Sequence, residues 1–380
     1  MVMAGAIIAP VLPEILTGLH IAPQSGSSLV SLHFLTMGIA TPLFGILADR
    51  VGHRRLLITM LVSYAAIGMA GGLAQNLITL MGLRVLLGVA SGGVAAAGLG
   101  LVGQRYVGEA RTQVIGYVST ALTLGNVLYP LLGAVVGGWN WRWVFGLYGV
   151  GLPIALWVRL TDRQQVMEVA TEPAIDPHEP QSAALPPAPP IKLGQLFTQP
   201  VTLGLLVSLS LASGMVYSMV AYLPLYLKAN FATTVTVNGV MLALQAVGAA
   251  VISAIGMQPL SQRFGTRGCI GMGLGVMGIA LLLLPWVPHL GLVVPLALLF
   301  GMGFGVVVPN LYDALAQVAP ANLQASLMAA GTGVSFLGQF LAPIGLSLVV
   351  AQWGLGGVFR TAAAIALGLA GGILSRTGKN

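Results

Sequence analysis

The sequence predicts an all-α integral membrane protein with about twelve transmembrane helices in two related six-helix bundles. Composition is the first reason. Of the 380 residues, 57% are hydrophobic and 7% are charged, whereas soluble globular chains carry about 25% charged residues. The 52 glycines also fit membrane helices, because small residues let neighbouring backbones approach closely. The apolar runs and an internal repeat are the other two reasons.

Apolar runs long enough to cross a bilayer, about 20 residues each, fall into two sets of six. They lie near residues 1–17, 25–48, 56–74, 77–103, 111–137 and 143–160, and then near 200–228, 235–257, 268–287, 290–315, 323–350 and 355–374. The predicted domains are therefore an N-terminal bundle at 1–160 and a C-terminal bundle at 200–380. Between them, the polar, proline-rich segment 161–199 is interpreted as a flexible cytoplasmic linker. Because the first run is short, we expect its helix to begin upstream of Met1.

The distribution of basic residues predicts the orientation. If the N-terminus is cytoplasmic, twelve Lys and Arg residues lie in inside loops and three in outside loops, as the positive-inside rule requires. Both termini are then cytoplasmic, and a plasma (inner) membrane is expected. The net charge of +7 is spread over these loops and forms no basic stripe, which argues against a nucleic-acid partner. No metal-ligand spacing occurs, and Cys269 is the single cysteine.

An internal repeat supports the two-bundle prediction. The stretch LADRVGHR from Leu47 recurs as LSQRFGTR from Leu260, an offset of 213 residues. The same offset relates further pairs: Gly88 and Gly301, Gly92 and Gly305, Gln104 and Gln317, Gly125 and Gly338, and Pro130 and Pro343. An even number of helices between the copies predicts a parallel repeat, with the halves related by an axis along the membrane normal.

The most specific motif is GILADRVGHRR, residues 45–55, in the predicted loop between the second and third helices. It resembles the loop signature of the major facilitator superfamily, a family of membrane transporters. The resemblance implies a conformational switch, a loop that joins the two bundles in the outward-facing state and releases them as the protein alternates. The matching residues are Gly45, Asp49, Arg50, Gly52, Arg54 and Arg55. Topogenic charges and a tight turn are the alternative. In the second copy Gln262 replaces the acid, so we expect that loop to keep the turn and lose the switch.

Arg84 is the one basic residue inside a predicted span. A charge within the membrane is unfavourable and normally faces the bundle interior or a wet cavity, where it marks function. The stretch RVLLGVASGG resembles the superfamily's fourth-helix signature, which implies a role for Arg84 in proton relay. The alternative is a side chain that extends to the outer headgroups.

Two further stretches resemble drug/proton antiporters of the superfamily. The fifth helix carries Gly116, Gly125, Pro130 and Gly133 in the spacing of the antiporter signature, with Tyr129 and Ala134 in place of two of its glycines. In the first helix, PVLP at 10–13 matches a short antiporter motif. Ordinary small-residue packing and a plain proline kink are the alternatives.

Together these features predict proton-coupled efflux of small apolar or amphipathic compounds by a monomer, with the proton gradient as energy source and no cofactor. Proton-coupled uptake, a passive channel and a lipid-modifying enzyme are the alternatives, and the sequence shows no paired carboxylates or histidine cluster for the enzyme. By resemblance, the candidate proton-relay residues are Glu14, Arg84 and Asp313, and the substrate-cavity candidates are Tyr217, Tyr222 and Asn310. We further expect Arg84 to hold the charged form of Glu14, which would titrate.

Overall fold

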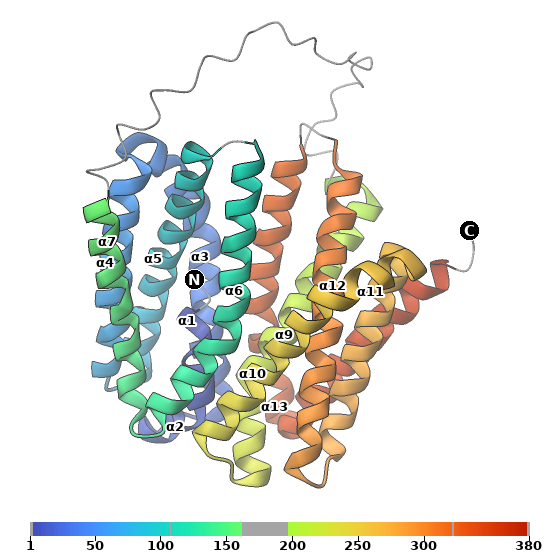
Figure 1. Ribbon diagram of the computed structural model, residues 1–380. Helices are drawn as coiled ribbons and strands as arrows, with labels where there is room; N and C mark the ends of the chain where they lie inside the picture. Colours follow the sequence, from blue (N-terminus) through green and yellow to red (C-terminus); the bar gives the residue numbers. More distant parts are fainter. Residues whose placement is uncertain (1–2, 107, 162–196, 321–322, 378–380) are drawn as a thin grey trace, which may run out of the picture.

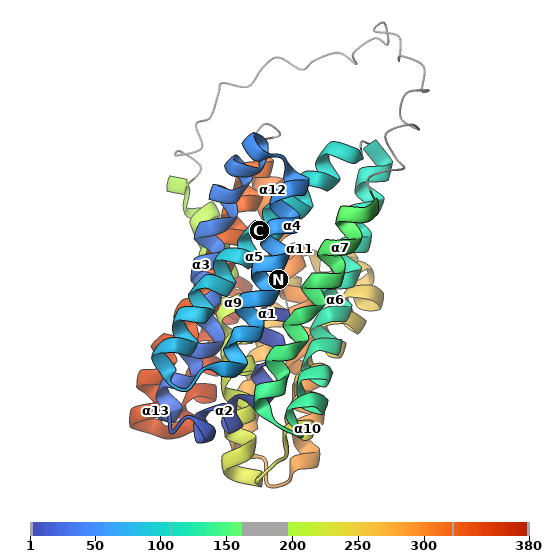
Figure 2. The ribbon, with the colours of Figure 1, turned by 90° about the vertical axis from the view of Figure 1, so that its left-hand side faces the viewer.

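A computed structural model describes residues 3–106, 108–161, 197–320 and 323–377. Within these ranges the regular structure is helical, with no strand. The helices run roughly side by side between two ends of the molecule (Figures 1 and 2). We call the end at which α7 stops and α9 starts the linker end, and the opposite end the far end. Residues 161–199, the predicted linker, lie mostly outside the described residues.

The first half of the chain forms the helices at the left of Figure 1. They are α1 (Met3–Ala6), η1 (Ala9–Val11), α2 (Leu12–Gly18), α3 (Pro23–Val51), α4 (His53–Ala70), α5 (Leu77–Arg105), α6 (Gly108–Gly137), η3 (Trp141–Val150) and α7 (Gly151–Leu160). The prolines at positions 10 and 13 explain why the first span is broken, since each lacks a backbone N–H. A 3-10 turn, η1, therefore connects two short α-helices.

The second half forms α9 (Pro200–Phe231), α10 (Val235–Val251) with a π-helical turn η7 (Ile252–Gly256), α11 (Met257–Leu283), α12 (Val293–Val318) and α13 (Gln324–Thr377). Two of these elements contain a reversal of direction. Gly265 in α11 has φ 65° and Gly354 in α13 has φ 67°, conformations that glycine adopts without steric strain. The described part of the chain therefore supplies nine apolar stretches, of which two contain a pair of helices, and the shorter Met3–Gly18. With the two paired stretches divided at their turns, the observed helices coincide with the predicted apolar runs to within a few residues.

The two halves contact each other mainly through two pairs of helices, α3 with α13 and α6 with α10, and also where α9 and α10 pack on α3 and the first span. The start of the chain lies in the middle of the molecule (Figures 1 and 2). Its side chains are almost completely buried, with Ile7 and Leu12 at 0% exposure. The first span is thus a central element, packed on by both halves.

The repeat detected in the sequence recurs in the helix contacts. In the first half, a Cβ at Gly88 would overlap the carbonyl of His33 on α3; in the second, a Cβ at Gly301 would overlap the carbonyl of Gln245 on α10. Glycine at both positions therefore lets α5 approach α3, and α12 approach α10, at backbone distance. By this contact, His33 and Gln245 occupy equivalent places in the two halves.

Candidate functional site

The side chain of Arg84 lies inside the first half and is only 2% exposed. Its Nη1 donates to the carbonyl of Ala4 at 2.6 Å and to Tyr148 Oη at 3.3 Å. Tyr148 Oη donates to the same carbonyl at 2.7 Å. The guanidinium also lies 5.8 Å from the ring centroid of Phe145. Arg84 therefore faces the bundle interior and does not extend to the outer headgroups.

The break in the first span explains why the Ala4 carbonyl is available. In a continuous helix, the N–H of Ile8 would bond this carbonyl. Here Ile8 N bonds the carbonyl of Gly5 at 3.2 Å, because the chain tightens before Pro10. The Ala4 carbonyl then accepts the bonds from Arg84 and Tyr148. The PVLP stretch thus creates the acceptor that holds the buried arginine.

Three more polar side chains surround Arg84. They are His33 on α3, Tyr64 on α4 and Tyr217 on α9, all at most 8% exposed. The hydroxyls of the two tyrosines make no hydrogen bond to the described residues, and the ring of His33 interacts with the Val30 backbone without a hydrogen bond of good geometry. We call Arg84, Tyr148, Tyr64, His33 and Tyr217 the central polar cluster. The charge of Arg84 acts electrostatically on the other four side chains.

Gly5 of α1 forms the floor of the cluster. A Cβ at this position would overlap Tyr217 Oη and would lie 3.0 Å from His33 Cε1. The rings of His33 and Tyr217 lie 6.4 Å apart between centroids, and Phe34 packs edge-on against Tyr217 at 4.4 Å. Because Tyr217 belongs to the second half, the cluster joins the two halves at their centre.

The sequence analysis identified Arg84 and Tyr217 but missed His33, Tyr64 and Tyr148. A signal for His33 was present, since it is a titratable residue inside the apolar run 25–48. The rule that ionisable residues within a span mark function applies to it as it does to Arg84. The tyrosines gave no comparable signal, because a tyrosine in an apolar run is ordinary.

Glu14 does not pair with Arg84, contrary to our expectation. Its Oε1 lies 3.4 Å from Lys228 Nζ of α9, and the two side chains are 24% and 49% exposed. The proline-broken chain puts Ala4 beside Arg84, and Glu14 lies ten residues further along, towards the far end. Glu14 is thus part of an ion pair between the halves.

Other contacts join the halves towards the far end. Asn238 of α10 donates to the carbonyl of Pro10 at 3.3 Å. A Cβ at Gly239 would lie 2.7 Å from the carbonyl of Pro130 on α6, so the α6–α10 contact is also made at backbone distance. The described hydrogen bonds and close backbone contacts between the halves therefore lie at this end.

The glycines of the fifth-helix motif differ in their contacts. A Cβ at Gly133 would lie 2.8 Å from the carbonyl carbon of Ile7, so Gly133 lets α6 approach the first span. The nearest neighbour of Gly125 is Tyr129 of its own helix, and a Cβ at Gly116 would have nothing within 4 Å. Pro130 and Gly133 thus pack against other helices in this arrangement, whereas Gly116 does not.

At the linker end, the motif residues 45–55, which we call the motif loop, are largely exposed. Contrary to the prediction of a loop, 45–51 belong to α3 and 53–55 to α4, with Gly52 between them. The carboxylate of Asp49 is 75% exposed and lies 3.6 Å from His53 Nε2. Arg50 and Arg55 are exposed, whereas Arg54 donates to the carbonyls of Val158 and Arg159 at 3.2 and 2.9 Å. Gly52 makes the turn with φ 90°, and Gly45 has no neighbour within 4 Å. These described contacts all stay within the first half.

The remaining candidates lie in the second half. Asp313 is exposed and accepts from Gln317 Nε2 at 2.7 Å and from Thr266 Oγ1 at 3.4 Å. Tyr222 is fully buried and donates to the carbonyl of Pro343 at 2.6 Å, and Asn310 donates to the carbonyl of Val306 at 2.8 Å. Tyr222 and Asn310 therefore stabilise helix packing and do not line an open cavity.

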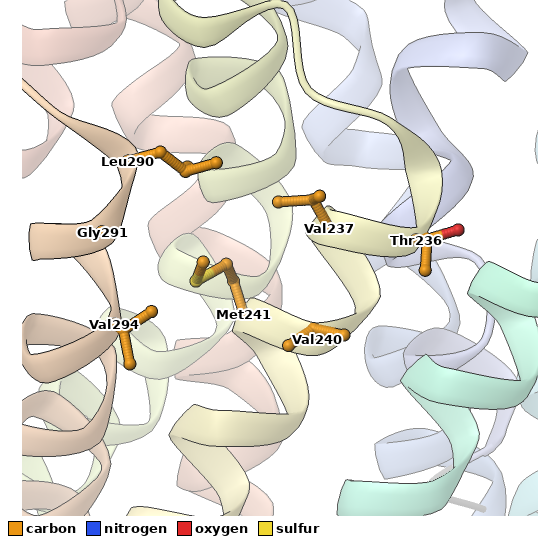
Figure 3. Close-up of a pocket in the computed structure, with 7 residues that line it drawn as sticks. All are labelled: Thr236, Val237, Val240, Met241, Leu290, Gly291 and Val294. Atoms are coloured by element: carbon orange, nitrogen blue, oxygen red, sulfur yellow. The ribbon is translucent and has the colours of Figure 1, made fainter.

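An apolar pocket of about 320 Å³ lies between α10 and the start of α12 (Figure 3). Its lining is Thr236, Val237, Val240, Met241, Leu290, Gly291 and Val294. Thr236 is the one polar side chain among them, and the pocket lies near the far end, away from the central polar cluster. It offers apolar contact but no charged group, so the chemistry of the site lies in the cluster around Arg84.

Apolar membrane-length helices in two repeated halves, with a buried charged cluster where the halves meet, define a polytopic membrane transporter. The chain matches the family model of the Major Facilitator Superfamily at residues 1–343 and 222–379 and belongs to that superfamily.

Relatives and solved structures agree with this assignment. The chain is 27% identical over 379 residues to the multidrug resistance protein MdtG of Enterobacter lignolyticus, covering 96% of this chain and 86% of the relative. It is 33% identical over 157 residues to the multidrug transporter QDR2 of Candida glabrata, covering 40% of this chain and 27% of that protein. The fold matches that of a bacterial homologue of the human lysosomal transporter Spinster in an inward-facing, occupied conformation. The TM-score is 0.76 at 17% identity, covering 100% and 94% of the two chains. The fold class predicted from the sequence is therefore confirmed, and the protein is a multi-pass membrane transporter and not an enzyme.

Proposed function

We propose that this protein exports small apolar or amphipathic compounds across the plasma (inner) membrane in exchange for protons. The observation that carries the proposal is the buried guanidinium of Arg84, held by Ala4 and Tyr148 where the two halves meet. A charge at such a place is retained in membrane proteins for function. The names of the multidrug relatives support the export of drug-like compounds.

Alternating access is the mechanism we propose. The contacts of Glu14 with Lys228 and of Asn238 with Pro10 hold the halves together at the far end, whereas Asp49 at the linker end is 75% exposed. The basic residues gather at the linker end, which supports a cytoplasmic position for it by the positive-inside rule. In the proposed cycle, this arrangement is the one closed to the outside, with the motif loop released.

The charges of the spans suggest which compounds are bound. The acids of the described residues, Glu14, Asp49, Glu109 and Asp313, lie near helix ends, and Arg84 is the charged side chain in the centre. A buried cation without a nearby carboxylate disfavours cationic ligands. We therefore propose that neutral and anionic amphipathic compounds are better substrates than cationic ones. The transporter would work as a monomer, with the proton gradient as its energy source.

A resistance assay tests this function. The protein is expressed in a bacterial host that lacks its own efflux pumps, and growth is measured with neutral chloramphenicol and cationic ethidium, with and without an uncoupler. We expect protection against chloramphenicol that the uncoupler abolishes, and weaker protection against ethidium. Accumulation in vesicles of known orientation separates export from uptake, and entry of compound from the outside would contradict the proposal.

A further inference from the structure

His33 is the one histidine of the central polar cluster, and the proposed function gives it no role. Helix α3 begins at Pro23, so at 1.5 Å per residue His33 lies about 15 Å from the far end of the helix, near mid-depth. The side chain is 0% exposed, and its ring nitrogens make no hydrogen bond of good geometry to the described residues, although the ring interacts with the backbone of Val30 one turn earlier. Buried polar groups are normally well paired. A fully buried imidazole that is poorly paired, in the centre of a membrane protein, therefore requires an explanation.

The surroundings of His33 show that a proton on its ring would be unfavourable here. Arg84 of α5 is the charged side chain that acts on it, and Tyr217 of α9 lies beside its ring at 6.4 Å between centroids. Tyr64 of α4 and Tyr148 of η3 lie around Arg84. Helices α1 and α13 contribute Gly5 and Phe336, which carry no titratable group. A protonated His33 would be a second buried cation beside Arg84, with no carboxylate among the described residues to balance it. Burial beside a second cation therefore disfavours the protonated ring in the present arrangement.

The position of the second half controls the access of water to His33. Tyr217, on α9, covers the imidazole together with Phe34, and Phe34 stacks on Phe336 of α13 at 5.8 Å. Both α9 and α13 belong to the second half, so a movement of the halves apart at the far end would uncover the ring. Hydration would then stabilise the protonated form, which the closed arrangement disfavours.

The second half provides an internal comparison. Gln245 takes the place of His33, as the contacts of Gly301 and Gly88 show, and Ala297 takes the place of Arg84. Gln245 is 6% exposed, and its Oε1 has no hydrogen-bond partner. Packing at this position therefore accepts a neutral amide. The titratable ring of the first half is not demanded by the fold.

We propose that His33 is the proton-carrying residue of the transport cycle. It binds a proton on a ring nitrogen when the halves separate at the far end. It releases that proton to water at the linker end when Tyr217 covers the ring again and leaves it dehydrated beside Arg84. No other bond forms or breaks. The proposal rests on the proton coupling of the proposed function, and it assigns the proton to a histidine of α3 instead of a carboxylate.

The test measures the distance between the halves as a function of pH. Spin labels are attached at Thr17→Cys and Ala229→Cys, two exposed far-end positions on opposite halves, in a Cys269→Ser background. Pulsed electron paramagnetic resonance then gives the populations of protein with the far end open and with the far end closed, in lipid nanodiscs between pH 5 and pH 8. In this range histidine alone among unperturbed side chains titrates. We expect the far-end-open population of the parent protein to grow as the pH falls.

The decisive variant is His33→Gln, which copies the residue of the second half. We expect it to remove the pH-dependent shift, with the ratio of open to closed populations changing at least about fivefold less across the range than in the parent. Two controls should keep the shift: His289→Gln, which changes an exposed histidine at the far end, and Glu14→Gln. His33→Asn is a second neutral variant, and thermal unfolding of each protein verifies that it is folded.

The outcomes separate this assignment from the proposed function. A shift that persists in folded His33→Gln and His33→Asn overturns the assignment, and a shift lost in Glu14→Gln instead gives the proton to the carboxylate. A parent protein without any shift overturns both the assignment and proton coupling. If the shift follows His33 but neither chloramphenicol nor ethidium is exported, the proposed export fails and the assignment of the proton to His33 stands.

Discussion

The two halves of the molecule share their packing but differ in their charges. Gly88 and Gly301 make the same backbone contact, with His33 in one half and Gln245 in the other. Arg84, however, is replaced by Ala297, which is also fully buried. The packing alone therefore needs neither the arginine nor the histidine. The first half holds the ionisable chemistry, and the second half covers it with Tyr217.

The loops at the linker end differ in a related way. Gly52 and Gly265 both turn with positive φ, but the acid Asp49 has Gln262 as its counterpart. The second half has an acid nearby nonetheless. Asp313 of α12, at the position equivalent to Gly100, accepts hydrogen bonds from Thr266 beside the turn and from Gln317. An acid therefore lies beside the turn in each half, near the end of α3 in the first and on α12 in the second, which the sequence comparison did not reveal.

Removing Arg84 has the largest expected effect on export, because it makes the first half resemble the second at this position. We expect Arg84→Ala to reduce export on the order of a hundredfold, since coupling between sites is typically worth up to about that factor. Arg84→Lys should keep part of the activity, because an ammonium can still donate to the Ala4 carbonyl but lacks the planar fork. Export in vesicles measures both. Wild-type rates in the two variants would show that the charge is structural.

The motif loop provides the second test. We expect Asp49→Asn to slow export about tenfold while binding of the compound stays nearly normal, because the proposed role of this carboxylate is in the change between arrangements. Gln262→Ala is the matched control in the second loop and should be mild. The rate of export by Asp313→Asn shows whether this acid of the second half also has a role in the change between arrangements. Near-normal turnover in Asp49→Asn would reject the switch.

Most of the fold could be predicted from the sequence, because bilayer thickness and the placement of basic residues constrain each span. Helix ends were close to the observed ones, for example 77–103 against Leu77–Arg105. The site could be predicted only in part. Arg84 was visible as a charge in a span, but its partner is a backbone carbonyl, Ala4, freed by a break in the helix. No pattern of side-chain types indicates a backbone acceptor.

The pairing of Glu14 was predicted wrongly for a related reason. The sequence predicts similar depths for Glu14 and Arg84 along their helices, but similar depth does not make two side chains neighbours. The rotation of a proline-broken helix about its axis decides which way its side chains face. Glu14 faces Lys228 of the other half.

The superposition of the halves about an axis along the membrane normal remains a prediction, with Leu47 to Arg54 on Leu260 to Arg267. An inverted relation would contradict the repeat.

The equivalent glycines offer a third test, of the packing that the halves share. A Cβ at Gly88 or Gly301 would overlap a backbone carbonyl, and a backbone atom cannot move aside as a flexible side chain can. We therefore expect Gly88→Ala and Gly301→Ala each to destabilise the protein by about 1–3 kcal/mol, measured as similar losses in thermal stability. Only Gly88→Ala should also alter the pH-dependent shift, because it displaces His33. Equal effects of the two substitutions on the pH-dependent shift would contradict the assignment of the ionisable groups to the first half.

The ion pair between the halves gives the smallest expected effect. Glu14 and Lys228 are partly exposed, with Lys228 at 49%, and such pairs contribute less than about 1 kcal/mol. We expect Glu14→Gln to open the far end slightly and to leave export coupled to the proton gradient, since the carboxylate closes the arrangement and does not carry the proton. Lys228→Met should have the same effect, and the double variant should add nothing further, because both changes remove one interaction. Export measured against pH in the three variants decides this. If Glu14→Gln abolishes coupling while Lys228→Met preserves it, the carboxylate has a role of its own beyond the ion pair.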